Sequence, residues 1–204
     1  MRPNDDDLMA ADRSFRTLDD LERTVRAIAR EFRTDTVFII GSQGLLLGWP
    51  DAPVATRMTP EIDAFPANAR IWEIEEKKKH PDEQPEASEH IDALFGSGSQ
   101  FHQTHGFYID GVDENTATLP AGWQDRAIVR EVDVGGRVVT AIAPCPEDLI
   151  VSKLARLDDK DKEFIESYHQ ARPLDRNLIE ERIQASRLEL TVADRAVAYI
   201  RSLV

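Results

Sequence analysis

The first part of the chain carries a helical pattern of hydrophobic residues followed by a strand-like one. The helical pattern repeats every three or four residues and consists of Leu18, Leu21, Val25, Ile28 and Phe32. Thr17 precedes it and two aspartates follow in the first turn, which is typical of a helix start. Residues 37–40 form an apolar, mostly β-branched run, which predicts a buried strand packed against this helix. The charged residues 1–14 predict a mobile segment or a frayed helix.

Two acidic residues flank an apolar one in the stretch Glu61-Ile62-Asp63. Side chains alternate between the faces of a strand, so a strand here places Glu61 and Asp63 on one face and Ile62 toward the core. Two neighbouring carboxylates repel each other unless a cation lies between them, and a divalent metal ion is the usual solution. The alternative is a pair of solvated acids on an edge strand.

Glycines mark the ends of the other predicted strands. Gly41 and Ser42 end the first strand, and the apolar residues of 45–49 predict a short helix packed back on it. Residues 127–134 and 137–143 flank Gly135-Gly136 and predict a β-hairpin.

Most of the remaining chain has the periodicity of helices. Helices are predicted over residues 68–79, 86–95, 146–157, 175–187 and 191–204. We therefore expect an α/β (α+β) fold, in which a mixed β-sheet flanked by helices occupies residues 1–145. Residues 146–204 are expected to form a helical C-terminal part packed on this core.

Composition limits the class of protein. The 204 residues, 41% of them hydrophobic, can bury the core of one large domain or of one domain with a helical appendage. No apolar run is long enough to span a membrane, and the single cysteine, Cys145, fits a reducing compartment, so we expect a cytoplasmic protein. The net charge of −13 argues against non-specific binding of nucleic acid, but it is compatible with metal binding or a basic partner protein.

The order of strand, Gly-Ser, helix and second strand with two carboxylates resembles the DNA polymerase beta-like nucleotidyltransferase superfamily. Gly41-Ser42 and Glu61/Asp63 match its signature, although the spacing is longer than in the common form and the first carboxylate is Glu rather than Asp. The resemblance implies that Glu61 and Asp63 bind Mg²⁺, with two ions in the site. It also implies that Ser42 and the backbone after Gly41, including Gln43, hold the terminal phosphates of a nucleoside triphosphate.

The superfamily normally supplies a third carboxylate from a later strand. Glu131 and Asp133 share one face of the predicted hairpin, and we choose Glu131 as the third metal ligand because it lies farther from the turn. Arg57 precedes the acidic pair, and the resemblance implies a contact with a phosphate. An exposed surface arginine is the alternative.

Residues 101–106 place two histidines in what reads as a loop between glycines. This stretch, with Tyr108, Gly111-Val112 and residues 119–123 (Leu-Pro-Ala-Gly-Trp), resembles a bacterial subfamily of nucleotidyltransferase-like proteins. That subfamily is related to the AbiE and MenT types of toxin in toxin–antitoxin systems. The resemblance implies that the loop lies beside the carboxylates.

The two histidines of this stretch have different expected roles. We expect His105 rather than His102 to point inward, as a proton acceptor or phosphate ligand, because Gly106 permits a closer approach. The alternative is that both histidines only fix the loop. A zinc site is disfavoured because neither a cysteine pair nor a third histidine accompanies them.

The predicted helix over residues 146–157 begins with a proline and two acids in its first turn. Lys153 and Lys160-Asp161 resemble the "Asp-Leu-x-x-x-Lys-Leu … Lys-Asp" segment of the toxin-type nucleotidyltransferases. The resemblance implies that Lys153 binds the triphosphate, that Asp161 helps to hold it in place, and that Lys160 contacts the nucleotide. The alternative is that Lys153 is an ordinary exposed lysine.

The resemblances, which cover about residues 17–170, imply a Mg²⁺-dependent nucleotidyltransferase. It would move a nucleotidyl group from a nucleoside triphosphate to an acceptor such as transfer RNA or a protein. They also imply a role in a toxin–antitoxin system or in phage defence, with an antitoxin or regulator as the partner. The alternative is a non-catalytic protein of the same fold that binds such a partner. Nucleic-acid binding without chemistry is a third hypothesis, which the net charge disfavours.

Overall fold

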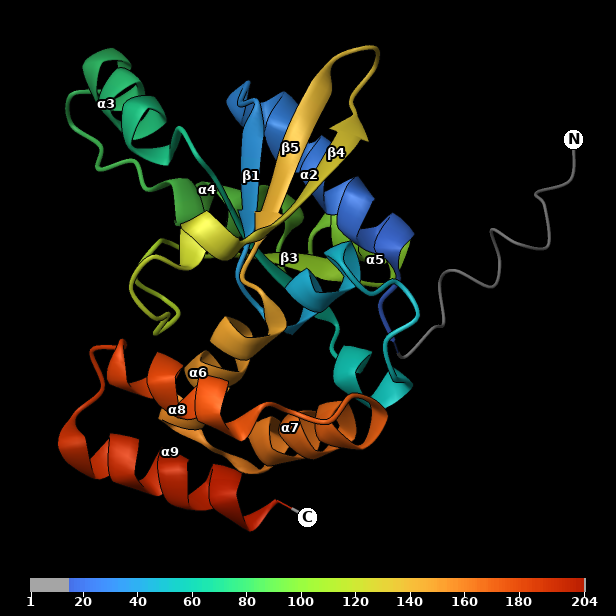
Figure 1. Ribbon diagram of the computed structural model, residues 1–204. Coiled ribbons are helices and arrows are strands. Elements are labelled where there is room, and N and C mark those ends of the chain that lie inside the picture. The colour runs from blue at the N-terminus through green and yellow to red at the C-terminus, as the bar shows by residue number, and fades with distance from the viewer. Residues whose placement is uncertain (1–14, 204) are drawn as a thin grey trace, which may run out of the picture.

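The computed structural model describes residues 15–203, and the predicted mobile or frayed segment 1–14 lies outside this part, as does Val204. A sheet with flanking helices stands above a group of C-terminal helices (Figure 1). In chain order the elements are α2 (Leu18–Phe32), β1 (Thr36–Ile39), η1 (Ser42–Leu47), η2 (Val54–Arg57), β2 (Glu61–Pro66), α3 (Ala69–Lys79), α4 (Ala87–Phe95), α5 (Gln100–His105), β3 (Tyr108–Gly111), η3 (Trp123–Arg126), β4 (Ile128–Asp133), β5 (Val138–Ala143), α6 (Pro146–Arg156), α7 (Asp159–Ala171), α8 (Arg176–Gln184) and α9 (Leu190–Ser202). The predicted α/β class with a helical C-terminal region is confirmed.

The mixed sheet has five strands in the order β3-β2-β1-β5-β4. Strand β1 runs antiparallel to β2 and parallel to β5, whereas β2 and β3 are parallel and β4 and β5 are antiparallel. The predicted hairpin is confirmed, and Gly135 and Gly136 at its turn have φ values of 69° and 87°, which a two-residue turn of this kind requires. The sequence does not predict β3, because its four residues are too few to show an alternating pattern.

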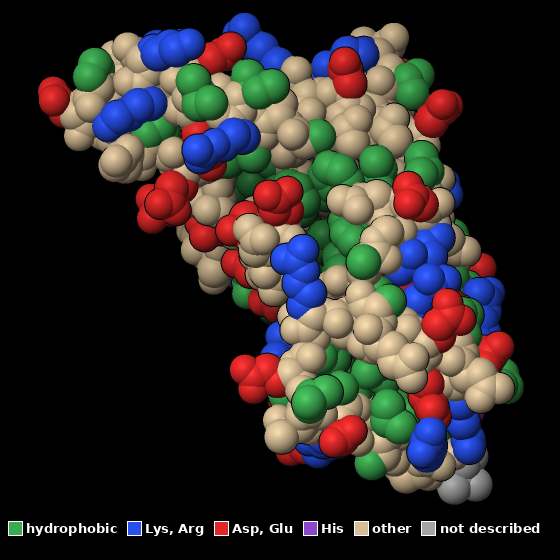
Figure 2. All heavy atoms as spheres, turned by 60° about the vertical axis from the view of Figure 1, so that its left-hand side comes forward, with side chains coloured by type: hydrophobic (Ala, Val, Ile, Leu, Met, Phe, Trp, Pro, Cys, Tyr) green, Lys and Arg blue, Asp and Glu red, His purple; other side chains and the backbone are tan. Residues whose placement is uncertain are grey.

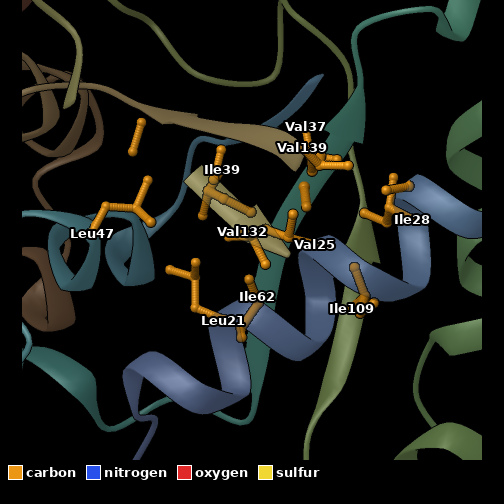
Figure 3. Close-up of a cluster of buried hydrophobic side chains, with 14 of the residues drawn as sticks. Leu21, Val25, Ile28, Val37, Ile39, Leu47, Ile62, Ile109, Val132 and Val139 are labelled. Atoms are coloured by element: carbon orange, nitrogen blue, oxygen red, sulfur yellow. The ribbon is translucent and has the colours of Figure 1, made fainter. Parts of the chain in front are cut away.

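Helix α2 forms as the sequence predicts and covers one face of the sheet. Thr17 accepts a hydrogen bond from the backbone amide of Asp20, whose carboxylate accepts one from the Thr17 amide, so the pair forms a capping box. The buried face of α2 packs on strand residues that include Ile39, Ile62 and Val132 (Figure 3). Ile62 is completely buried, and alternation along β2 therefore turns Glu61 and Asp63 to the opposite face of the sheet.

A second hydrophobic cluster holds the C-terminal helices together. It is built mainly from α6 to α9, and it also includes Leu45 of η1 and Ala52 from the turn after it. Asp148 of α6 is fully buried and forms ion pairs with Arg126 of η3 at 2.8 Å and with Arg182 of α8 at 3.7 Å. These contacts fix α6, and with it Lys153, against the end of the sheet.

Two local predictions differ from the structure. Residues 101–106 lie in helix α5 and the turn after it rather than in a loop, because Ser99 caps the helix by accepting a hydrogen bond from the His102 amide. Gly106 ends α5 with a φ of 71°, so the flanking residues act as helix caps. The short helix after β1 is a 3₁₀ helix over Ser42–Leu47 and stops before Trp49. None of the described helices is long and apolar enough to cross a membrane.

Candidate functional site

A cleft of about 500 Å³ lies between the sheet face opposite α2 and helix α6. Its walls are formed by Ile40, Gly41, Ser42, Glu61, Asp63, Asp110, Thr116, Ala117, Thr118, Leu149, Ser152, Lys153, Ala155 and Arg156. The structure thus brings Gly41, Ser42, the Glu61/Asp63 pair and Lys153 together, although they are distant in sequence. One wall of the cleft is acidic and the facing wall is cationic.

Asp63 is the most perturbed carboxylate in the cleft. Burial and the negative charges of Glu61 and Asp110 raise the pKa of Asp63 to about 6, and the charges of Lys153 and Arg156 only partly oppose this rise. Among the described residues, no hydrogen bond or ion pair reaches its carboxylate. A Cβ added at Gly41 would lie 1.6 Å from the Asp63 Oδ2 atom, so the close approach of this carboxylate to the backbone requires glycine at position 41.

Glu61 is held by a tyrosine from the neighbouring strand. Parallel pairing of β2 and β3 sets Tyr108 opposite Glu61, and the Tyr108 hydroxyl donates a hydrogen bond of 2.8 Å to Glu61 Oε2. The hydrogen bond to Glu61 and burial raise the pKa of Tyr108 to about 12. The hydroxyl therefore keeps its proton at neutral pH and fixes the orientation of the Glu61 carboxylate.

Asp110 is a third acid in the cleft that the sequence does not single out. It pairs with Asp63 across β2 and β3, and burial together with the charges of Asp92 and Glu61 raises its pKa. The signal that would find it is parallel pairing of β3 with β2, which is not visible in so short a strand.

Glu131, chosen from the sequence as the third ligand, lies elsewhere. It is exposed on β4, at the opposite edge of the sheet from β3. The strand registers put it about 14 Å across the sheet and about 13 Å along the strands from Asp63. Glu131 thus has the residue type and the sheet face expected of a ligand, but it lies too far from Asp63 to share a metal ion with it.

The cationic wall is provided by the end of α6. Lys153 is only 9% exposed, and its Nζ atom lies 3.3 Å from Asp161 Oδ1 and 4.4 Å from the centre of the Phe164 ring. Burial lowers the pKa of Lys153, against the opposing effect of Asp161. Lys153 is therefore not an ordinary exposed lysine.

Asp161 accepts hydrogen bonds from both cations of this wall, Lys153 and Arg156. Burial alone would raise its pKa, but two hydrogen bonds of 2.8 Å from the Arg156 guanidinium and the charge of Lys153 lower it. Arg156 stays largely exposed while it lines the cleft. The sequence does not predict a role for Arg156, because an arginine in the last turn of a helix is explained by the helix dipole alone.

Three other residues predicted to bind the nucleotide, Gln43, Arg57 and Lys160, do not line the cleft. Gln43 is buried beside Ser42, and neither atom of its amide has a hydrogen-bond partner among the described residues. Arg57 lies outside the cleft lining, where it donates a hydrogen bond to the Arg16 carbonyl and stacks over Phe15. Lys160 is exposed on α7 and also lies outside the lining.

The two histidines of α5 do not line the cleft. His105 packs against Phe101 and Phe107, with ring centres 4.6 Å and 6.2 Å apart, and burial lowers its pKa. His102 lies nearer to the acids, because its ring centre is 5.2 Å from that of Tyr108. Its Nδ1 accepts a hydrogen bond from the Gly98 amide. His102 contacts the acidic wall only indirectly, because its ring packs on Tyr108, which in turn donates a hydrogen bond to Glu61.

Comparison with protein families identifies one match for almost the whole described chain. A family model described as "Nucleotidyltransferase of unknown function (DUF6036)" matches residues 16–199. Comparisons with curated proteins and with solved structures found no match.

Proposed function

This chain belongs to that family of nucleotidyltransferases, and from this premise we propose that its cleft transfers a nucleotidyl group from a nucleoside triphosphate to an acceptor hydroxyl. The observation that carries the proposal is the pairing of two opposite walls. Glu61, Asp63 and Asp110 face the cleft from the sheet, while Lys153 and Arg156 face it from α6. A triphosphate complexed with a divalent cation carries both kinds of charge that such walls bind.

The acidic wall fits Mg²⁺. All of its ligand atoms are carboxylate oxygens, and the Asp63 carboxylate is partly buried without a paired cation among the described residues. No three carboxylate, imidazole or thiol side chains of residues 15–203 form a ready-made metal cage. Mg²⁺ does not need one, because it is commonly held by one or two carboxylates together with substrate phosphates and water. Glu61 and Asp63 would be these two carboxylates, with Asp110 beside them.

Each wall has a defined task in the proposed reaction. Magnesium bound at the acids would neutralise charge on the leaving pyrophosphate and activate the acceptor hydroxyl. Ser42 and the backbone after Gly41 bind the terminal phosphates, and Lys153 and Arg156 neutralise the triphosphate on the other side. Asp161 holds both cations in place through its hydrogen bonds.

The finer identity of the protein is part of the same proposal. Residues 101–123 resemble a bacterial subfamily related to the AbiE- and MenT-type toxins, and the Lys153 to Asp161 segment resembles the toxin-type nucleotidyltransferases themselves. Both resemblances support a role in a toxin–antitoxin system. The acceptor would then be a transfer RNA or a protein, and an antitoxin would be the partner. A non-catalytic partner-binding protein is the competing function. Glu61, in place of the superfamily's aspartate, leaves that function open, whereas the opposite charges of the two cleft walls argue for the enzyme.

The direct test is transfer of label. Purified protein is incubated with each of four α-³²P-labelled nucleoside triphosphates, Mg²⁺ and either total RNA or a protein extract, and we expect one acceptor pool to become labelled. Label should disappear with EDTA and with Asp110→Asn, but it should persist with Glu131→Gln. Absence of label in every pool, together with unchanged protein stability on addition of Mg²⁺ and nucleotide, would favour the non-catalytic function.

Tyr108→Phe is expected to raise the Mg²⁺ concentration needed for half-maximal transfer by about tenfold, because Glu61 loses the hydroxyl that orients it. Folding stability should change little, since the ring stays in place. The matched control is Tyr199→Phe, which removes a similar hydrogen bond of 2.9 Å to Glu166 in the C-terminal helices and should leave the Mg²⁺ dependence unchanged. An unaltered Mg²⁺ dependence in Tyr108→Phe would show that Glu61 is not held for a metal ion.

A further inference from the structure

A second cleft, of about 470 Å³, adjoins the carboxylate cleft. Ala117 and Thr118 form part of both linings. The new cleft is lined by Phe38 of β1, Phe65 of β2 and Trp123 of η3. Figure 2 shows hydrophobic side chains gathered in the middle of this side of the molecule, between the sheet region and the C-terminal helices, with acidic side chains beside them.

The aromatic side chains of this second cleft continue the face that carries the acids. Asp63 and Phe65 are two residues apart on β2, so their side chains project from the same face about 7 Å apart. Phe38 stacks on Phe65 with ring centres 4.9 Å apart and meets Trp123 edge-on at 6.0 Å. Phe38 and Trp123 remain partly exposed. The buried Phe65 ring next to Asp63 therefore supports an aromatic surface whose accessible rings are those of Phe38 and Trp123.

We propose that this aromatic cleft binds the nucleobase of the incoming nucleoside triphosphate, an inference that rests on the proposed function of the neighbouring cleft. A nucleotide whose phosphates lie between Ser42, Lys153 and Arg156 must place its base outside that charged cleft. Planar bases gain binding energy by stacking on aromatic side chains. The Gln124 and Asn115 side chains and the Arg187 guanidinium also line the cleft and supply polar groups for the edge of the base.

The charge around the cleft favours this occupant over an acceptor nucleic acid. Among the described residues that line it, Arg187 is the only cation, and it is accompanied by the acidic Glu114. A nucleic-acid strand would place several negatively charged phosphates beside these acids, which would repel them, whereas a single base carries no phosphate. The volume also suits one small ligand rather than an extended chain.

The test separates the base from the phosphates. Affinities for ATP, GTP, CTP, UTP and inorganic tripolyphosphate are measured by calorimetry in the presence of Mg²⁺. Wild-type protein should bind at least one nucleoside triphosphate about tenfold more tightly than tripolyphosphate. Trp123→Leu and Phe38→Leu should abolish this difference and leave the tripolyphosphate affinity unchanged. Trp72→Leu, which alters a partly buried tryptophan near α4 outside both clefts, is the control and should retain it.

The outcomes distinguish the two proposals. If tripolyphosphate and nucleoside triphosphates bind equally well to wild-type protein, the aromatic cleft is not a base site, although the phosphate site stands. If neither binds, both proposals fail. If the Phe38 and Trp123 variants keep the preference for nucleoside triphosphate and lose only acceptor labelling, the cleft belongs to the acceptor and the inference is overturned.

Discussion

Asp63→Asn is expected to lower nucleotidyl transfer by at least about a thousandfold while making the metal-free protein more stable at neutral pH. The activity is lost because an amide cannot replace a carboxylate as a ligand of Mg²⁺. The stability gain arises because Asn removes an unfavourable negative charge. In the metal-free protein Asp63 is a partly buried carboxylate beside Glu61 and Asp110, and its pKa is raised from 3.8 to about 6.

The raised pKa fixes the sign of the pH dependence. A carboxyl group that binds its proton more tightly in the folded state stabilises the fold below about pH 4, and this stabilisation is lost as the pH rises through about 6. At pH 7.5 the charged Asp63 therefore costs the fold on the order of 2 kcal/mol. Asn has no charge to bury, so the variant should be more stable by a similar amount at pH 7.5 and equal to wild type near pH 3.5.

Urea unfolding at pH 7.5 and pH 3.5, with and without Mn²⁺ or Mg²⁺, measures this difference. Divalent ions should stabilise wild-type protein at pH 7.5 and should not stabilise Asp63→Asn. Glu131→Gln serves for comparison, since it removes an exposed carboxylate of the same sheet face, and it should keep the response to metal. A destabilised Asp63→Asn protein would show instead that Asp63 is a structural residue, and the metal assignment would fall with it.

The parts of the site that could be predicted from sequence are those encoded locally. The alternation at Glu61-Ile62-Asp63 is complete within three residues, and the buried Ile62 fixes the direction of both acids. The glycine after β1 is likewise informative, because the Asp63 carboxylate occupies the space of its missing side chain. The helical spacing of α2 and the Gly-Gly hairpin turn are local signals of the same kind.

The parts that were missed depend on contacts between distant segments. Asp110 enters the cleft because β3 pairs in parallel with β2, and a strand of four residues gives no periodicity from which to predict that pairing. The sequence predicts a loop at α5 because Ser99 and Gly106 are typical of chain breaks, whereas in the structure they cap the helix. Glu131 satisfied the expected residue type and face, but strand order decides distance, and two strands separate β4 from β2.

The aromatic cleft could not be predicted from the sequence either. Phe38 and Phe65 belong to strands and fit an ordinary hydrophobic core, so their residue types carry no sign of a binding surface. Phe38 stays accessible because the segment that ends in Trp123 covers this face of the sheet only in part, whereas Phe65 is buried beneath the Phe38 ring. The surface exists only because the fold brings β1, β2 and η3 together.

Lys153 places a largely buried cation in the α6 wall of the cleft. Burial lowers the pKa of the Lys153 amino group, so keeping this group charged destabilises the fold. A bound polyanion would stabilise the charged form and offset this cost. The one described hydrogen bond of Lys153 goes to Asp161, which keeps two further bonds from Arg156. Removing the amino group therefore does not leave Asp161 unpaired.

Lys153→Met is expected to reduce nucleotidyl transfer by a factor of about 100 to 1,000 and to weaken tripolyphosphate binding, while the fold stays as stable as wild type or becomes slightly more stable. Methionine keeps the length and the contact with Phe164, but it brings no charge to the triphosphate. Transfer rates, tripolyphosphate affinity and urea midpoints of Lys153→Met are compared with those of Lys160→Met. Lys160 is predicted from the sequence to contact the nucleotide but is exposed outside the cleft, so its variant should bind tripolyphosphate nearly as wild type does. Equal losses in the two variants would mean that the triphosphate lies along the surface of α7 rather than between α6 and the acids, and the orientation of the nucleotide proposed for this cleft would be wrong.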